Sequence, residues 1–468
     1  MAIAVVLRRT LIGVCALLAI AACQVRSERD EAQPQPAADP APLPLAVAAP
    51  PTAAPPAAPV PAAPAPRTLP ALDREPEIGV LLLSAPRLSF TLLGPGRLLT
   101  GAQALDLPAG KVTVEAAAGG WRLAGSGAIV KGEGVITVRV AAGQPAFSAT
   151  PAPPFGKAPL LKLSGRAVLR AQSGRVELIE RLPLEIYLAG VLPVEMNPGW
   201  PTGALAAQAI AARSYACARW LERFDQSWQL HWHYTVDMAY GGWRKPTPNV
   251  TAALSATRGR MVMTRGLPVL ALFHASSGGT TEAAGNLWPG LRGPDGTTPI
   301  IDVMGVAEDP AAQPGAKGLG LGATHQHWKA DIPLVEITAG LQAWAAEKPT
   351  LRPAFGTVTG VKSGRRFPDS KRVATVIVSH KRGKKTVQTA VAGNDFRLAV
   401  GPGVVRSTAW DRCVVAAKDG GTLVLEGHGF GHGVGLSQVS AWWLAQQGVS
   451  ADQIVGRFYP GAELRSAW

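Results

Sequence analysis

The stretch that decides the fold reads Val191-Leu-Pro-Val-Glu-Met-Asn-Pro-Gly-Trp-Pro-Thr-Gly-Ala-Leu-Ala-Ala-Gln-Ala-Ile-Ala-Ala-Arg-Ser-Tyr-Ala-Cys-Ala-Arg219. A single acid, Glu195, stands in its uncharged first part. Pro198 and Pro201 interrupt any helix there, and an Ala-rich segment without Gly or Pro follows from Ala204 to Phe224. The pattern predicts a loop that carries one carboxylate, followed by a buried helix that starts beside Pro201.

Glu195 admits two interpretations at this point. A carboxylate in apolar surroundings has a raised pKa, which is what a general acid needs. A loop acid can equally serve only to cap the helix that follows it. Taken alone, the stretch favours this structural alternative.

Length and composition limit how large a core the chain can form and which partners it suits. The chain has 468 residues, 47% of them hydrophobic and 17% charged, so it can bury a substantial core. Its net charge of +14, with only 32 acidic residues, predicts an anionic partner. An export signal at the N-terminus argues against nucleic acid as that partner.

That signal is expected over residues 1–22. Arg8 and Arg9 precede an apolar run that is too short to span a bilayer, and the run ends Ile20-Ala-Ala-Cys23. A small-residue cleavage site directly before a Cys is the processing signal of bacterial lipoproteins, so Cys23 is predicted to carry lipid. Gln24 follows it and favours the periplasmic face of the outer membrane. An ordinary signal peptide with a chance Cys is the alternative.

Residues 23–74 are rich in Pro and Ala and cannot form a core, so they are predicted to be a disordered tether. A Pro-rich ligand for a partner is the alternative. Cys217 and Cys413 are the cysteines left after processing. They either pair in an oxidising compartment or remain single, Cys217 then being a small buried group.

The folded part alternates in the manner of strands over much of its length. Residues 75–158 are predicted to be a β-rich region, and residues 159–468 a second domain with the Ala-rich helix. Shorter helices are expected at 250–258, 337–347, 393–400, 438–448 and 452–458. Strands dominate, so the class is α+β, with a few helices around a central cleft.

Four blocks of sequence, in this order, resemble the SpoIID/LytB family, whose sporulation member is a peptidoglycan lytic transglycosylase. They are Leu192-Pro-Val-Glu-Met196 with Trp200-Pro201, Ala206-Ala-Gln-Ala209 and Ala211-Ala-Arg-Ser-Tyr-Ala216; Asp237 to Gly242; His274 to Glu282 with Trp288 and Pro299-Ile-Ile-Asp-Val303; and Gly431-His-Gly-Val-Gly-Leu-Ser-Gln438 with Phe458-Tyr-Pro-Gly461. The likeness covers roughly residues 160–465 and implies a SpoIID-like fold.

The resemblance implies that Glu195 is the catalytic acid of an enzyme that cleaves the MurNAc–GlcNAc β-1,4 bond of peptidoglycan, including strands without stem peptides. One carboxylate can suffice because the attacking hydroxyl belongs to the sugar itself, so the usual glycosidase pair is not required. The alternative is a non-catalytic module that binds glycan and enhances an N-acetylmuramoyl-L-alanine amidase. A serine or metal hydrolase is a third interpretation, and it lacks a Gly-x-Ser-x-Gly elbow.

The other matched positions are candidates for substrate binding, each with a structural alternative. Arg213 either binds a substrate carboxylate or pairs within the protein, and Tyr240 either orients a sugar or belongs to the core. His432 lines the cleft or lies in a tight turn, and Ser437 and Gln438 bind glycan or cap a helix. The remaining candidates are Asp237, His274, Ser276 and Ser277.

Two departures from the family pattern stand out. Some members bind zinc through a His and two Cys between the Ala-rich helix and the Asp237 block, whereas this chain has only His231 and His233 there. We therefore expect no structural zinc, and no cofactor. Val439-Ser440 replaces the family's usual Tyr-Gly.

Overall fold

The computed structural model describes residues 68–468, except residues 102, 119, 126–127, 141–144, 154–156, 299, 310–311, 313–326, 347–354 and 418–420. The predicted signal peptide, Cys23 and nearly all of the predicted tether therefore lie outside the described residues. Among the described residues, no helix is long and apolar enough to cross a membrane.

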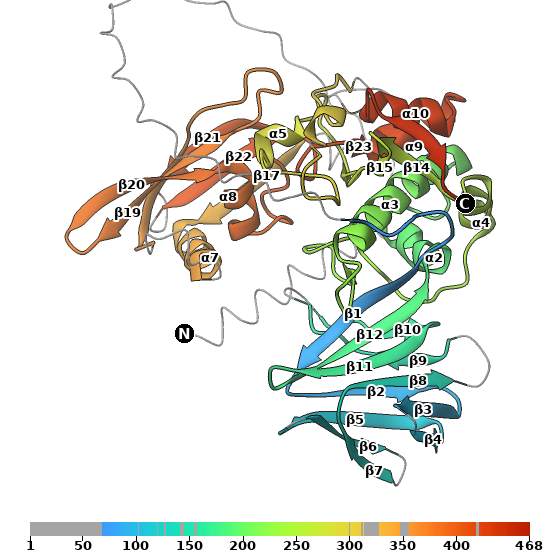
Figure 1. Ribbon diagram of the computed structural model, residues 1–468. Helices are drawn as coiled ribbons and strands as arrows, with labels where there is room; N and C mark the ends of the chain where they lie inside the picture. Colours follow the sequence, from blue (N-terminus) through green and yellow to red (C-terminus); the bar gives the residue numbers. More distant parts are fainter. Residues whose placement is uncertain are drawn as a thin grey trace, which may run out of the picture.

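Two packed sheets form the first part of the fold (Figure 1). The seven-stranded sheet has the order β13 (Leu230–His231), β1 (Glu77–Ala85), β12 (Arg175–Pro183), β11 (Arg166–Gln172), β8 (Val135–Val140), β3 (Gly96–Thr100) and β4 (Gln103–Leu107). The six-stranded sheet has the order β10 (Leu161–Leu163), β9 (Phe147–Ala149), β2 (Arg87–Leu92), β5 (Gly110–Ala117), β6 (Gly120–Gly125) and β7 (Ala128–Gly132).

The core of this part lies between the two sheets. Every second residue of β2 is buried, as are Val112 and Val114 in β5, as the period of two in a half-buried strand requires. Phe90 and Phe147 meet edge to face at 5.9 Å within that core. The alternating runs in the sequence thus fix which face of each strand is buried.

The predicted division between residues 158 and 159 falls inside this arrangement. Strand β1, from the N-terminal side, pairs antiparallel with β12 from the other side over most of its length. Strand β8 pairs with β11 in the same way. Hydrogen bonding and packing are therefore shared across the boundary.

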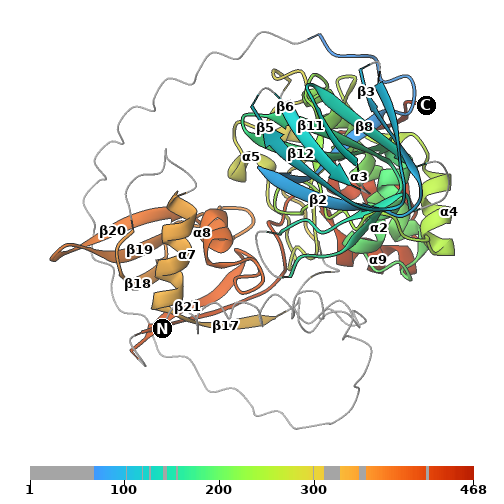
Figure 2. The same cartoon turned by 90° about the horizontal axis from the view of Figure 1, so that it is seen from below.

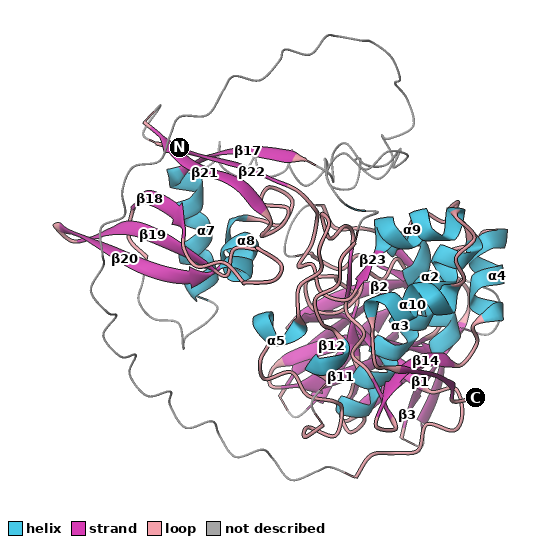
Figure 3. Cartoon of the chain, turned by 90° about the horizontal axis from the view of Figure 1, so that it is seen from above, coloured by secondary structure: helices cyan, strands magenta, loops and turns pink. Residues whose placement is uncertain are grey.

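A helical layer continues directly from the sheet. β12 runs into α2 (Leu184–Glu195), which is followed by α3 (Thr202–Glu222). Around α3 lie α4 (Pro248–Ala256), α9 (Gln438–Gln446) and α10 (Ala451–Phe458), as Figure 3 shows. The prediction of a buried Ala-rich helix starting beside Pro201 is confirmed, because almost every α3 side chain up to Ala218 is buried.

Short strands complete this layer. β14 (Arg260–Thr264) pairs with β15 (Leu267–Pro268) and with β24 (Glu463–Ser466). β16 (Phe273–His274) pairs in parallel with β23 (Leu436–Ser437). Helix α5 (Ala284–Leu287) and a 3-10 turn (Ile301–Val303) lie in the segments between them.

A separate lobe lies between the third and fourth blocks of the sequence (Figure 2). It contains two three-stranded sheets, β17 (Trp328–Pro333), β22 (Thr422–Gly427) and β21 (Trp410–Ala416), and β18 (Val358–Ser363), β19 (Thr375–Arg382) and β20 (Lys385–Ala392). Helices α7 (Leu334–Ala346) and α8 (Gly393–Val400) pack with them around a hydrophobic core of their own. The chain is thus α+β and strand-rich, as the sequence predicts.

Both remaining cysteines are single. Cys217 is buried in α3 and Cys413 is half-buried in β21. Burial raises the pKa of the Cys217 thiol, so it is an apolar packing group there.

Arg213 serves the fold rather than a ligand. Its side chain is fully buried on α3, and Nε and Nη2 both donate to the Glu185 carboxylate of α2, each at 2.8 Å. Nη1 donates to the carbonyl of Arg260 in β14. This geometry favours the structural alternative for Arg213, a pairing within the protein.

The ion pair should dominate the stability of the α2–α3 contact. We expect Arg213→Ala to lower the free energy of unfolding by about 3–5 kcal/mol, because Glu185 is then left buried and unpaired. The double variant Glu185→Leu/Arg213→Met should lose much less. Urea denaturation checks this, and a loss below about 1 kcal/mol for Arg213→Ala would contradict it.

Candidate active site

Glu195 lies at the end of a helix, not in a loop. It is the last residue of α2, whose final turn contains Pro193, and Met196 after it is extended. The prediction of a loop at Glu195 is wrong. α2 continues through Pro193, with Val191 and Leu192 buried before it, and ends only where Met196 leads toward Pro198.

The Glu195 carboxyl is partly buried, and its pKa is raised to about 7. Removal from water is the main cause. The backbone N–H of Ala239, which donates to Oε1 at 2.6 Å, and the Gln438 side chain oppose it and lower the pKa. The C-terminal end of α2 also disfavours a negative charge. Near neutral pH this group can therefore both give and accept a proton.

Asp237 fixes one end of the segment that carries the Ala239 donor. Its carboxylate is fully buried and forms ion pairs with Arg219 of α3 and with Arg223 directly after that helix, both at 3.2 Å. It also accepts hydrogen bonds from the Tyr215 hydroxyl and from the backbone N–H of His231. With every side of the carboxylate occupied, Asp237 holds the backbone in place rather than a sugar.

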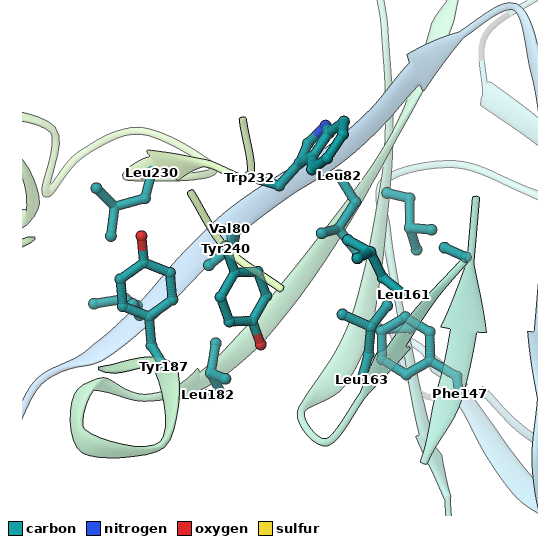
Figure 4. Packing of buried hydrophobic residues seen from close by; sticks show 14 of the residues in the cluster. Val80, Leu82, Phe147, Leu161, Leu163, Leu182, Tyr187, Leu230, Trp232 and Tyr240 are labelled. Atoms are coloured by element: carbon teal, nitrogen blue, oxygen red, sulfur yellow. The ribbon is translucent and has the colours of Figure 1, made fainter. Parts of the chain in front are cut away.

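Tyr240 fixes the other end of that segment. It is buried, stacks on Tyr187 of α2 at 4.9 Å, and donates its hydroxyl proton to Glu180 at 2.9 Å (Figure 4). The burial and contacts of Tyr240 favour its core alternative. Because Asp237 and Tyr240 anchor the backbone on both sides, the Ala239 N–H is aimed at Glu195.

Gly190 makes this close packing possible. The backbone N–H of Gly241 donates to the Gly190 carbonyl at 3.0 Å. A Cβ at Gly190 would lie 2.5 Å from Cε2 of Tyr240 and 2.6 Å from the carbonyl oxygen of Gly242. Only a glycine lets this face of α2 approach the segment so closely.

Glu180 is the rival acid, and sequence reasoning did not single it out. Burial raises its pKa to about 7 as well. However, its side chain is fully inaccessible, and its oxygens accept from the backbone N–H groups of Ser164 and Gly165 and from Tyr240. It therefore acts on the site only through Tyr240, which leaves Glu195 as the acid a substrate can reach.

His274 and His432 lie together at the strands β16 and β23. Their ring centroids are 5.6 Å apart, and the ring of Trp288 is 5.4 Å from that of His432. His274 is buried and donates from Nδ1 to the carbonyl of Val434 at 3.0 Å. His432 is half-buried, and its Nδ1 accepts the N–H of Val434 at 3.1 Å.

Both imidazoles are held neutral. Burial lowers the pKa of His432 to about 3, helped by the nearby charges of Arg397 and Arg372. Burial, His432 and Arg372 lower the pKa of His274 in the same direction. Neither can donate a proton as an imidazolium at neutral pH, whereas Glu195 can hold a proton there.

The two arginines come from the lobe that contains α7 and α8. Arg372 is buried, donates to the carbonyl of Ser277, and lies against Gly433, where a Cβ would be 2.5 Å from its Cζ. Ser370 donates to Glu282 at 2.5 Å from the same segment. The lobe is thus attached to the loops that carry His274 and His432, a role that sequence reasoning missed.

The serines form a buried network. Ser277 and Ser440 both donate to Oδ2 of Asp309, at 2.7 and 2.6 Å, and Ser437 contacts Ser440 at 3.0 Å. Ser276 exchanges backbone hydrogen bonds with Phe430 and is buried. Because Ser277 is committed to Asp309, this cluster is arranged for packing and not for nucleophilic attack.

Gln438 is the one matched residue of the fourth block that lies beside Glu195. It is the first residue of α9, and its side chain is nearly buried. Its proximity lowers the pKa of Glu195, although its Nε2 forms no regular hydrogen bond among the described residues. Ser437 before it makes no side-chain capping bond to α9.

Two cavities, of about 370 and 310 Å³, lie elsewhere. The larger is on the face of β8, β11 and β12, and the smaller is beside the C-terminal end of α3. Neither is lined by Glu195. Within the described parts of the chain, no three His, Cys, Asp or Glu side chains form a metal-binding group.

Comparison with known proteins agrees with the sequence blocks. A family model described as SpoIID, Stage II sporulation protein, matches residues 172–264, which include Glu195, α3 and the Asp237 segment. The chain is 27% identical to Stage II sporulation protein D of Bacillus amyloliquefaciens, over 62% of this chain and 76% of that protein. Residues 172–264 thus match the SpoIID family, and the named relatives support the resemblance of the chain to SpoIID/LytB proteins.

Two further relatives are similar to the chain at comparable identity. The Amidase enhancer of Bacillus subtilis is 26% identical over 60% of this chain but only 40% of its own length. An uncharacterized protein of Brachyspira hyodysenteriae is 28% identical over 61% of this chain and 67% of that protein. The SpoIID match itself covers the first two blocks, where the Glu195 site is built.

A methyl group at Gly190 should damage the site. Although Ala favours a helix over Gly by about 1 kcal/mol, we expect Gly190→Ala to lower the melting temperature, because the new Cβ displaces Tyr240 and Gly242. Gly456→Ala in α10 is the matched control, since a Cβ there meets nothing within 4 Å. Gly456→Ala should raise the melting temperature. Equal stabilisation by both substitutions would rule out the close approach at Gly190.

The raised pKa of Glu195 predicts that this group makes the folded state less stable at high pH than at low pH. The unfolded state loses this proton near the ordinary value of 4.5 and the folded state near 7. Stability is therefore unaffected below the first value, falls between the two, and stays reduced above the second. Glu195→Gln should be more stable than wild type by about 1–3 kcal/mol at about pH 8 and equal to it at about pH 4. A pH-independent difference would refute the shift.

Proposed function

We propose that the protein cleaves the glycan strands of peptidoglycan as a lytic transglycosylase. The match to the SpoIID family and the relative named Amidase enhancer support a cell-wall-related role. The observation that carries the finer proposal is Glu195, a partly exposed carboxyl with a pKa raised to about 7 and one N–H donor on Oε1. The causes that set this pKa include no second carboxylate.

The reaction then needs one acid. Protonated Glu195 gives its proton to the oxygen between MurNAc and GlcNAc as the bond to C1 breaks. The carboxylate that remains accepts the proton of the MurNAc 6-hydroxyl, whose oxygen bonds to C1. The products are a 1,6-anhydro sugar and a free GlcNAc hydroxyl. No water is consumed, so the second carboxylate that activates water or attacks C1 in other glycosidases is unnecessary.

The Ala239 N–H has a defined part in this cycle. It contacts Oε1 in both protonation states but interacts more strongly with the carboxylate. It thereby stabilises the form of Glu195 that must accept the second proton. Burial favours the form that gives the first proton and outweighs the hydrogen bond, so the pKa lies near 7.

The second candidate is a glycan-binding module that enhances an amidase. The relative with that name favours it, and it needs the surface around Glu195 but not the proton transfer. Under either function we propose export with a lipid on Cys23, which places the protein at the peptidoglycan layer from the outer membrane.

Digestion of purified sacculi tests the enzyme proposal. Wild type should release products with 1,6-anhydro ends, detected by mass spectrometry, and Glu195→Gln should be slower by about 10²–10⁴-fold. Glu336→Gln, on the exposed face of α7, is the matched control and should keep full activity. Equal release by Glu195→Gln would remove this residue from the mechanism. Sedimentation with sacculi but no release by wild type would favour the binding module.

The rate should also depend on pH with a definite sign. Only protonated Glu195 can start the reaction, so kcat should fall as the pH rises through about 7. Initial rates on sacculi over this range check it. A kcat that increases through neutrality would instead require Glu195 to act first as a base.

A further inference from the structure

Trp200 and Trp442 form an aromatic pair that the catalytic proposal does not use. Their ring centroids are 6.2 Å apart, with the planes inclined at 45°. Both residues are half-buried. Trp200 follows the end of α2, while Trp442 lies within α9, so two separate elements bring the rings together.

Trp442 of the pair shares a helix with Gln438, the residue of α9 that interacts with Glu195. Gln438 and Trp442 are one turn apart on α9 and therefore project from the same face of that helix. Gln438 is close enough to Glu195 to lower its pKa. One turn further along, Trp442 meets Trp200, which lies on the segment that leaves Glu195. The same face of α9 thus follows the chain from the carboxyl to the ring pair.

Core packing explains only part of this arrangement. Trp200 packs with one side against the helical core around α3. Trp442 joins none of the hydrophobic clusters found among the described residues, and Trp200 is the ring partner recorded for it. An indole on the same helix face as Gln438 and left partly open to solvent offers apolar ring surface to a ligand.

We propose that Trp200 and Trp442 form a stacking subsite for a pyranose ring of the glycan strand. One face of an N-acetylhexosamine ring in a β-1,4 strand is made of C–H groups, and it buries apolar area against an indole without losing hydrogen bonds of its hydroxyls. The subsite holds a sugar near the bond that Glu195 cleaves, and this inference rests on the proposed function. It assigns Trp442 as a residue that sets affinity and not the chemical step.

The test measures binding separately from cleavage. In the Glu195→Gln background, the full chain is titrated with glycan strands from sacculi whose stem peptides an amidase has removed. Trp442→Ala should raise the Kd about tenfold, as expected for the loss of one stacked ring, while Trp442→Phe should restore most of the affinity. Trp443→Ala is the matched control on the next position of α9, and should change the Kd less than about twofold.

Kinetics with the intact carboxyl provide the second measurement. Trp442→Ala should raise KM for sacculi more than it lowers kcat, and circular dichroism should show an unchanged fold. An unchanged Kd for Trp442→Ala, or an equal loss for Trp443→Ala, would overturn the subsite. If wild type binds strands with Trp442-dependent affinity but releases no anhydro product, the enzyme proposal fails and the subsite stands.

Discussion

The hydrogen bond from the Ala239 N–H to Glu195 is the contact on which the rest of the site depends. It joins the last residue of α2 to a segment with no regular structure of its own, and at 2.6 Å it is short. A backbone donor can take this position only if its segment is held rigidly. The fold supplies that rigidity through Asp237 on one side and Tyr240 on the other.

Much of the buried charge of the first half of the fold serves this purpose. Arg219 and Arg223 neutralise Asp237, and Glu180 receives the hydroxyl of Tyr240 from the sheet side. These groups carry the features expected of catalytic residues, namely burial and a specific polar partner. Their partners are nevertheless internal, so they position the one carboxyl that remains partly open.

The lobe of residues 328–427 holds loops on the other side of the site in a similar way. Through Arg372 it reaches the loops that hold His274 and His432, and its positive charge adds to the burial that lowers the pKa of both rings. The site therefore has one group that titrates near neutral pH and is accessible. A single accessible acid is what a reaction without water requires.

The sequence predicted local features well wherever one residue type dominated. The helix that starts beside Pro201 and the shorter helices expected at 250–258 and 452–458 follow from helix propensity. The prediction of a loop at Glu195 was wrong, because α2 continues through Pro193 in the packed structure. The sequence also could not assign Asp237 or Arg213, because their ion pairs join residues distant in sequence. Family resemblance marks such residues without telling a positioning role from a binding one.

The central claim is that Glu195 is protonated near neutral pH, and a direct titration of its carboxyl tests it. The full chain with ¹³C-labelled glutamate side chains would be followed by NMR, and the Glu195 signal identified by its absence from Glu195→Gln. The account predicts a midpoint near 7 for the Glu195 signal. The pKa of Glu180 is also raised to about 7, but the Glu180 signal is told apart because it remains in the Glu195→Gln spectrum. A midpoint close to the ordinary value of 4.5 would contradict it.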